Sequence, residues 1–443
     1  MKIELVKNNI DPVDLSVGSA RTCYSKTLVT PEKVTNWEKK KSLLVDLFKS
    51  GHHTTLQHAH FTFLIEGVSR LSLWRFFHSH RFYNSDQVSQ RYTETNKESF
   101  KDFKNQEIYN YHTYLSEKYY ELTDIFTKIY EESKNPVERK NAKKKAMENA
   151  RYILPQSVLA NLYHTINLST LLRYHYGVKY VADCQKEVKE IVENMVELVL
   201  KEYPDLKELF ELNDKSNIRS VYDNRIIKFY NENKLCSLVD FSVFEDEYDL
   251  WYGDTAGLGA LFNSTIGTTY VKFNLKLSLS ADAQNQRHRT AYGTRPELSE
   301  IIVRSYHKSI NNYYMPDVFK ESDKAQEIFQ ECITKSIDLI DKEDIEDKSY
   351  FLLNAFQIPI TEVNSGVDFI HKVQKRLCLN SQEEITKVTW CMVNAIKEVS
   401  ILSNYAEMVA PPCVSRFKQN ITPTCPEGSR FCGVKEWHSD KYE

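Results

Sequence analysis

The chain has 443 residues and a net charge of −3, with 41% hydrophobic and 27% charged residues, which is typical of a globular protein with two or three domains. This charge excludes a global basic field for nucleic acid, so an anionic ligand would have to be held by local arginines. We find no signal-like N-terminus, no apolar run of membrane-spanning length and, with nine scattered cysteines, no disulfide scaffold. We therefore expect a cytoplasmic protein without nucleic-acid or membrane partners.

The first elements along the chain predict a strand that leads into an arginine-containing loop. Residues 60–70 (HFTFLIEGVSR) are strand-like, and the loop 78–92 reads HSHRFYNSDQVSQRY. Residues 141–149 (NAKKKAMEN) predict a solvated helix face rather than a binding patch, and ARYILP follows at 150–155. The polar stretch 213–217 is the best candidate for a linker.

The second part of the chain repeats this order. Residues 271–280 (VKFNLKLSLS) alternate with a period of two, which predicts a strand through Leu279. The loop QNQRHRTAYGTRPEL follows at 284–298, again with a His-Arg pair. Arginine suits the recognition of phosphate or of a planar anionic ring, because its fork donates two parallel hydrogen bonds and stays charged. One such loop alone is more often a solvated surface loop.

Two further matches indicate an internal duplication. Residues 71–81 align with 277–289 if a two-residue gap is allowed, which places His80 on His288 and Arg81 on Arg289. Residues 167–188 align with 364–385 without a gap, because Asn167 to Lys179 and Asn364 to Arg376 are both 12 residues. A helix with apolar residues at helical spacing follows in each copy. We predict two related halves, 1–214 and 226–443, in an α+β fold with a mixed sheet and long helices.

Taken together, these motifs resemble the flavin-dependent thymidylate synthases. The family signature runs from an Arg-His-Arg triplet to a Ser-x-Arg-Tyr run, and ARYILP and the segment ending in Gln185 are also similar. The second half is similar through QNQRHR and KRLCLNSQEEI. In the first half the signature positions hold Ser79, His80, Arg81, Asn84, Asp86, Gln87, Ser89, Arg91 and Tyr92.

The resemblance implies an FAD-dependent thymidylate synthase, a methyltransferase that converts dUMP to dTMP with methylenetetrahydrofolate and NADPH. No cysteine attacks the pyrimidine in this family. Arg376 would be catalytic, because a fixed guanidinium in a site with little water favours the ionised uracil ring. Gln284, Arg287, Gln87, Val88, Ser89, Gln90, Arg91 and Arg151 would bind the substrate. Thr54, His80, Arg81, Arg287, His288, Arg289, Asn167 and Asn364 would bind the cofactor.

The two halves lack different parts of this set. The first half has Phe76, Ser79 and Lys179 where the family has a nucleotide-binding glutamine, the leading arginine and the activating arginine. The second half lacks the Ser-x-Arg-Tyr run and has Lys348 roughly where the counterpart of Arg151 belongs. In the family, each active site lies between subunits of a homotetramer. We therefore hypothesise one composite site built from both halves, in a homodimer that forms a pseudo-tetramer.

Some departures leave alternatives open. Gln87 and Asp86 replace the signature glutamate and asparagine, and Ser169 and Gly366 stand where a flavin-contacting arginine belongs. The chain could therefore be an inactive nucleotide-binding regulator, or could modify another pyrimidine nucleotide. We expect no metal at the site. A structural zinc at Cys413, Cys425 and Cys432, with Cys378 or His438 as a fourth ligand, is the alternative to free thiols in this tail.

Overall fold

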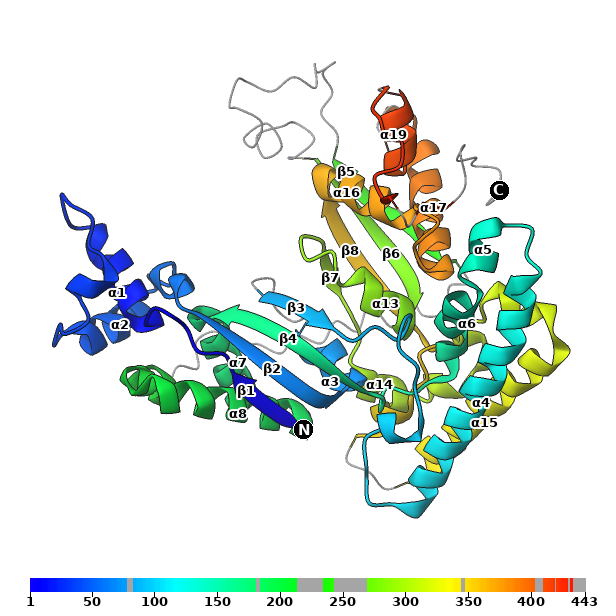
Figure 1. The fold of residues 1–443 in the computed structure, drawn as a ribbon, viewed down its shortest axis with the longest axis horizontal. Helices are drawn as coiled ribbons and strands as arrows, with labels where there is room; N and C mark the ends of the chain where they lie inside the picture. The colour runs from blue at the N-terminus through cyan, green and yellow to red at the C-terminus, as the bar shows by residue number, and fades with distance from the viewer. Residues whose placement is uncertain are drawn as a thin grey trace. The chain divides into compact units, whose positions relative to one another are not determined.

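The structure, a computed structural model of the chain, describes residues 1–77, 83–180, 184–212, 234–242, 269–343, 347–402, 409–418, 420–428 and 431–432. The chain forms two compact units (Figure 1). Unit 1 comprises Met1–Ser89, Glu98–Asp102 and Ser157–Val221, and unit 2 comprises Gln90–Lys97, Phe103–Gln156 and Tyr222–Glu443. The units therefore differ from the predicted halves, because segments 90–97 and 103–156 of the first half fold with the second. The predicted linker 213–217 lies outside the described residues.

Unit 1 is built on a four-stranded sheet in the order β1-β2-β4-β3, formed by β1 (Lys2–Leu5), β2 (His60–Ser69), β4 (Leu159–Asn167) and β3 (Tyr83–Gln87). Alternate residues of β2, including Phe61 and Phe63, are fully buried. The helices are α1 (Pro12–Thr22), α2 (Lys40–Lys49), α3 (Arg70–Ser72), α7 (Leu168–Tyr180), α8 (Lys186–Glu202) and α9 (Lys207–Glu211). The apolar stripe of α8, with Ile191 and Met195 fully buried, packs against this sheet.

Unit 2 repeats the strand order as β5-β6-β8-β7, formed by β5 (Cys236–Ser242), β6 (Tyr270–Ser278), β8 (Gln357–Ser365) and β7 (Tyr292–Thr294). Its second-half helices are α13 (Leu279–Asn285), α14 (Leu298–Val303), α15 (Asp323–Lys342), α16 (Gly366–Arg376), α17 (Glu383–Lys397) and α19 (Pro412–Lys418). The first half contributes α4 (Gln106–Glu131), α5 (Pro136–Lys140) and α6 (Ala142–Ala150), and α4 lies beside α15 (Figure 1).

The fold class is α+β, as expected. The mixed sheet is wrong, because every strand pair in the described residues is antiparallel. The expected strand through Leu279 ends at Ser278, whose side chain caps α13 by accepting a hydrogen bond from the Ala281 amide. The solvated face expected at 141–149 is only partly so: Lys143 and Lys144 are exposed, but Glu148 is buried.

The helix caps correct the alignment of the two arginine loops. Ser69 caps α3 as Ser278 caps α13, and each serine also donates its hydroxyl to a buried glutamate, Glu187 or Glu384. Counted from these caps, His80 is 11 residues on and His288 is 10 residues on. The first copy is thus one residue longer, and the two-residue gap that we placed in it is wrong. The π-helix Leu73–Phe77 absorbs the extra residue.

Strand register also changes the counterpart of Asn167. Leu159 pairs with Ser69 as Gln357 pairs with Ser278, so Asn167 corresponds to Ser365 rather than to Asn364. Asn167 and Ser365 both precede a helix and accept a hydrogen bond from the amide three residues later. The gapless match to Asn364 is therefore off by one residue.

The two copies meet in unit 2 through a reciprocal contact. The Gln156 amide donates to the Leu352 carbonyl at 3.0 Å, and the Asn354 amide donates to the Leu154 carbonyl at 2.8 Å. Pro155 and Leu353 form the bridge between these bonds. Equivalent residues contact each other in both directions, which is the pattern of a two-fold interface in a homodimer. By the same count Ser349, and not Lys348, is the counterpart of Arg151.

Candidate active site

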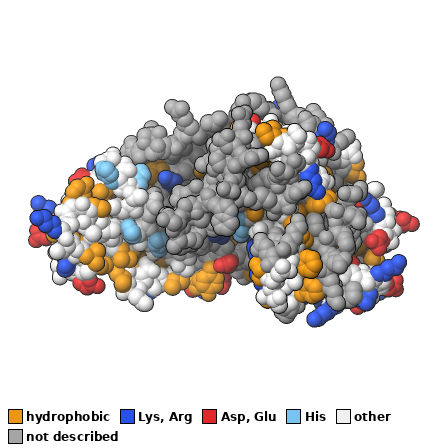
Figure 2. All heavy atoms as spheres, turned by 90° about the horizontal axis from the view of Figure 1, so that it is seen from above, with side chains coloured by type: hydrophobic (Ala, Val, Ile, Leu, Met, Phe, Trp, Pro, Cys, Tyr) orange, Lys and Arg blue, Asp and Glu red, His pale blue; other side chains and the backbone are white. Residues whose placement is uncertain are grey.

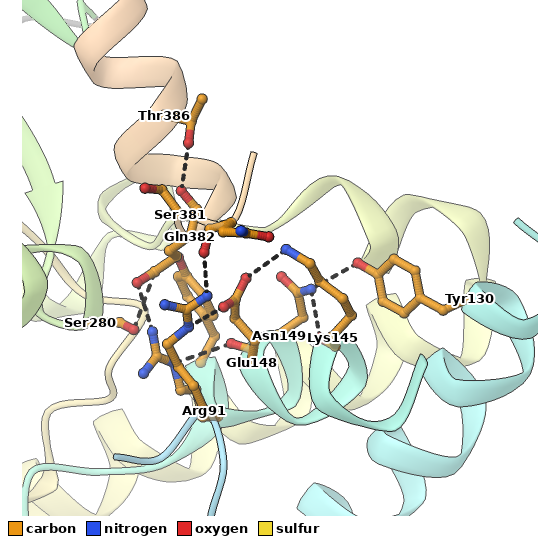
Figure 3. Close-up of polar contacts among 12 residues, drawn as sticks. Arg91, Tyr130, Lys145, Glu148, Asn149, Ser280, Ser381, Gln382 and Thr386 are labelled. Atoms are coloured by element: carbon orange, nitrogen blue, oxygen red, sulfur yellow. Dashed lines mark hydrogen bonds and ion pairs between the residues drawn. The ribbon is translucent and has the colours of Figure 1, made fainter. Parts of the chain in front are cut away.

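Two arginines of the first half contact the buried residue Glu148 in unit 2. Arg91 follows β3 by a short loop, and Arg151 begins the 3₁₀ turn Arg151–Ile153 at the end of α6. The Nε of Arg91 is bonded to the Glu148 carboxylate, and Lys145 Nζ lies 3.3 Å from it (Figure 3). Burial alone would raise the pKa of Glu148, but Lys145, Arg91 and Arg151 lower it below its ordinary value. Glu148 is therefore ionised at neutral pH. Its carboxylate orients Arg91, and its backbone carbonyl accepts a hydrogen bond from Arg151 Nε at 3.2 Å.

Both arginines also bond to the second half of the chain. Arg91 Nη2 donates to the Asn380 carbonyl at 2.8 Å, and Arg151 Nη2 donates to Gln382 Oε1 at 2.6 Å. Asn380 and Gln382 belong to the loop between α16 and α17, which Figure 3 shows above the α6 residues. This loop directly follows Arg376, the last residue of α16.

Arg376 is held against the second arginine loop. Its Nη2 donates to the Gln284 carbonyl at 2.7 Å. The pKa of Arg376 is lowered to about 10, first by burial and then by the positive charges of Arg287 and Arg91, against the opposite effect of Glu362. The pKa of Arg151 is lowered by burial and by the same two neighbours, against the effect of Glu148. Arg151 and Arg376 are thus buried close to the positive charges of Arg91 and Arg287, an excess of positive charge that favours the binding of an anion.

His288 is the best defined member of the Arg-His-Arg triplet. Its pKa is lowered to about 3, mainly by burial and then by the positive charges of Arg376 and Lys372. Its ring lies 5.7 Å from the ring of His371 in an edge-on arrangement. At neutral pH His288 is therefore uncharged and offers a hydrogen-bonding edge rather than a cation. Arg289 follows it in the loop.

The other residues predicted for the site are divided between the units. Thr54 precedes the 3₁₀ turn Thr55–His58, and it belongs to unit 1 with Asn167 and with the segment 87–89 that ends β3. Gln90 belongs to unit 2, is buried, and accepts a hydrogen bond from Asn354 at 3.3 Å. Asn364 donates to Glu362 at 2.8 Å. His80 and Arg81 lie outside the described residues.

A hydrogen-bonded chain behind Arg151 was missed by sequence reasoning. Gln382, which accepts from Arg151, donates to the hydroxyl of Tyr152, and this hydroxyl donates to Glu384 at 2.7 Å. The Ser278 amide donates to the same carboxyl group at 2.7 Å. A signal existed, because a glutamate stands two residues after the glutamine in both copies, at Glu187 and Glu384.

The raised pKa of Glu384 predicts that the stability of the protein depends on pH. Burial raises its pKa from 4.5 to about 7, against the hydrogen bonds from Ser278 and Tyr152. The folded state then binds a proton that the unfolded state releases, so stability falls as pH rises from about 5 to 8, by about 3 kcal/mol. We expect Glu384→Gln to lose this slope, which urea unfolding of both proteins across that range measures. Parallel curves for the two proteins would contradict the assignment.

The cysteines of the tail are not arranged as metal ligands in the described residues. All nine cysteines fall within the described ranges, and each is a free thiol. Within those ranges, no three His, Cys, Asp or Glu side chains are placed to hold a metal ion. His438 lies outside them.

No helix of the described residues is both long and apolar enough to span a bilayer. On the face shown in Figure 2, acidic and basic side chains are interspersed.

The family model and the related sequences that match this chain all name thymidylate synthases. The model of the family described as thymidylate synthase complementing protein matches residues 4–205 and 258–400. A flavin-dependent thymidylate synthase of Clostridium tetani is 29% identical over 216 residues, which are 46% of this chain and 85% of the relative. That of Pyrococcus abyssi is 30% identical over 205 residues, or 45% and 80% of the two chains. A Helicobacter pylori thymidylate synthase X structure with FAD and dUMP is 18% identical, with a TM-score of 0.35, over 48% of this chain and 98% of that one.

Proposed function

Because the chain belongs to the thymidylate synthase complementing protein family, we propose that it is an FAD-dependent thymidylate synthase that methylates dUMP to dTMP at one composite site. The observation that carries the proposal is the convergence of Arg91 and Arg151, from the first half, on the loop after Arg376, from the second. The relatives matched above are named flavin-dependent thymidylate synthases, and each aligns to less than half of this chain. Neither half of this chain has the full set of site residues, but the two halves together supply Arg91, Arg151 and Arg376.

In this proposal the first-half arginines bind the phosphate of dUMP. Arg91 and Arg151 are fixed by Glu148 and Gln382, so little conformational entropy is lost when they bind the phosphate. Gln284 and Arg287 recognise the nucleotide from the second half. The ring is activated by Arg376, whose charge favours negative charge on the uracil carbonyl in a dry environment.

The described residues of unit 2 also fit a flavin. His288 Nε2 is a buried atom without a hydrogen-bond partner, and buried polar atoms of this kind are normally satisfied by a ligand or by water. Gln284 Oε1 and Arg376 Nε are also buried without a partner, and in this proposal they face the nucleotide. His288, Arg287 and Arg289 would hold the FAD, which when bound and reduced supplies the hydride. Methylenetetrahydrofolate as carbon donor and NADPH as reductant are part of the proposal, as are the cytoplasmic location and the pseudo-tetrameric homodimer.

Two measurements test the function. The purified protein should be yellow, bleach on addition of NADPH, and release tritium from the C5 position of labelled dUMP. A colourless protein that binds dUMP without tritium release would instead be the nucleotide-binding regulator. Release of tritium from labelled UMP but not from dUMP would show that the substrate is a different pyrimidine nucleotide.

A further inference from the structure

Unit 2 contains a buried ionic cluster that the proposed mechanism does not use. Glu362 on β8 and Lys372 on α16 form an ion pair, and both are almost completely buried. Asn285, the last residue of α13, donates to the other Glu362 oxygen at 2.6 Å. Burial alone would raise the pKa of Glu362, but Lys372, Asn364 and Asn285 lower it to about 2. The carboxylate is therefore ionised, with each oxygen bonded to a different element.

These contacts join the two elements that carry the second-half site residues. Asn285 directly follows Gln284 and precedes the Arg287–Arg289 loop. Lys372 is one helical turn before Arg376, on the same face of α16. Glu362 thus anchors the loop and the helix to one point on the sheet, and Arg376 bonds directly to the Gln284 carbonyl nearby. The negative charge of Glu362 also offsets the repulsion between Lys372 and Arg376.

The first copy fills the same three positions with aromatic side chains. Counted from the equivalent caps, Phe76 corresponds to Asn285, and the sequence alignment that placed it on Gln284 is off by one residue. By strand register, Glu362 corresponds to His164 and Lys372 to Tyr174. The rings of Phe76 and Tyr174 lie 4.2 Å apart between centroids, and those of His164 and Tyr174 stack at 6.1 Å. All three positions, on three different elements, therefore differ between the two copies.

Packing alone does not require an ionic cluster at these three positions. Removing charges from water is costly, and well-packed side chains without charge commonly give equal or greater stability at such a position. The aromatic trio shows that this fold accepts such a core. The ionic cluster stands in the copy that holds Arg287 and Arg376, whereas the aromatic trio stands in the copy with Ser79 and Lys179.

We propose that Glu362 is a positioning residue, which uses Asn285 and Lys372 to fix the Gln284–Arg289 loop and Arg376 at the spacing that dUMP requires. It acts through these residues and touches no substrate itself. The inference rests on the proposed function, because it assumes that Gln284 and Arg376 bind and activate the nucleotide.

The test transplants the aromatic trio into the second copy as N285F/E362H/K372Y. This combination removes both charges together, so no buried charge is left without its partner, and uses side chains that the chain already packs at these positions. We expect the melting temperature to stay within a few degrees of the wild type, dUMP binding by calorimetry to weaken at least tenfold, and kcat for tritium release to fall at least tenfold. Tyr174→Phe in the first copy is the matched control, with binding and release unchanged.

The outcomes separate this inference from the proposed function. A purely structural cluster would change the melting temperature or the folded fraction, but leave KM and kcat of the folded protein unchanged, and would overturn the inference alone. If the wild type binds dUMP but releases no tritium, the synthase function fails and dUMP affinity decides the role of Glu362. If the wild type binds no dUMP, both fail. Should the triple variant not fold, Glu362→Gln with the same two readouts replaces it.

Discussion

Replacing Arg376 with alanine is expected to reduce tritium release from dUMP by about 100- to 1,000-fold, the usual effect of losing one preorganised group that stabilises developing negative charge. The side chain is buried, is held by the Gln284 carbonyl, and is surrounded by other cations that keep its charge unbalanced. The flavin absorbance should remain, because the substitution leaves the Arg287–Arg289 loop intact. Stopped assays with labelled dUMP and the absorbance spectrum of the same sample measure both effects.

Lys179 is the matched control for this experiment. It also stands six residues before the glutamine that precedes a helix, but in the first copy. Lys179→Ala should leave the tritium release rate unchanged if the first copy supplies no activating cation. Equal losses in both variants would indicate two working sites per chain, and an active Arg376→Ala protein would remove this residue from the mechanism.

Replacing Arg151 with alanine is expected to weaken dUMP binding by about 10- to 100-fold, the range for a charge-assisted hydrogen bond. Arg151 lies between the Glu148 carbonyl at 3.2 Å and Gln382, and it is the first member of the chain that ends at Glu384. Its loss removes a cation from the anion-binding region while Arg91 and Lys145 still neutralise Glu148. Calorimetric titration with dUMP measures the change.

The control for Arg151 is Lys348→Ala in the second copy. Lys348 is the cation next to Ser349, the structural counterpart of Arg151. Its removal should leave dUMP affinity within twofold of the wild type, and both variants should melt cooperatively. A loss of affinity in Lys348→Ala as large as that in Arg151→Ala would mean that the second copy binds phosphate as well.

The sequence allowed the strands around Phe63 and Phe273 to be predicted, because alternating burial leaves a period of two that short-range patterns reveal. It did not reveal that α4 and α6 fold with the second half. An amphipathic helix shows that one face is buried, but not which part of the chain buries it. That pairing decides where Arg151 lies.

The candidate site shows the same division. The cations were readable as residue types, since Arg91, Arg151 and Arg376 stand at family positions. The residues that hold these cations in place were not predicted, because Glu148 looked like part of a solvated helix face. A second error was the match of Asn364 to Asn167. The second error arose because Asn and Ser cap helices equally well, so that Ser365 takes the place of Asn167 one residue later. Identity at one position was a weaker guide than the capping role.

The central claim is that one nucleotide site per chain is shared by the two copies. It is tested most directly by the stoichiometry of dUMP binding, measured by calorimetry on the wild type and on Arg91→Ala and Arg376→Ala variants. We predict one dUMP per chain in the wild type and a strong loss of binding in both variants, although the two arginines come from different halves. Two dUMP molecules per chain, or unchanged binding in Arg91→Ala, would contradict the shared site.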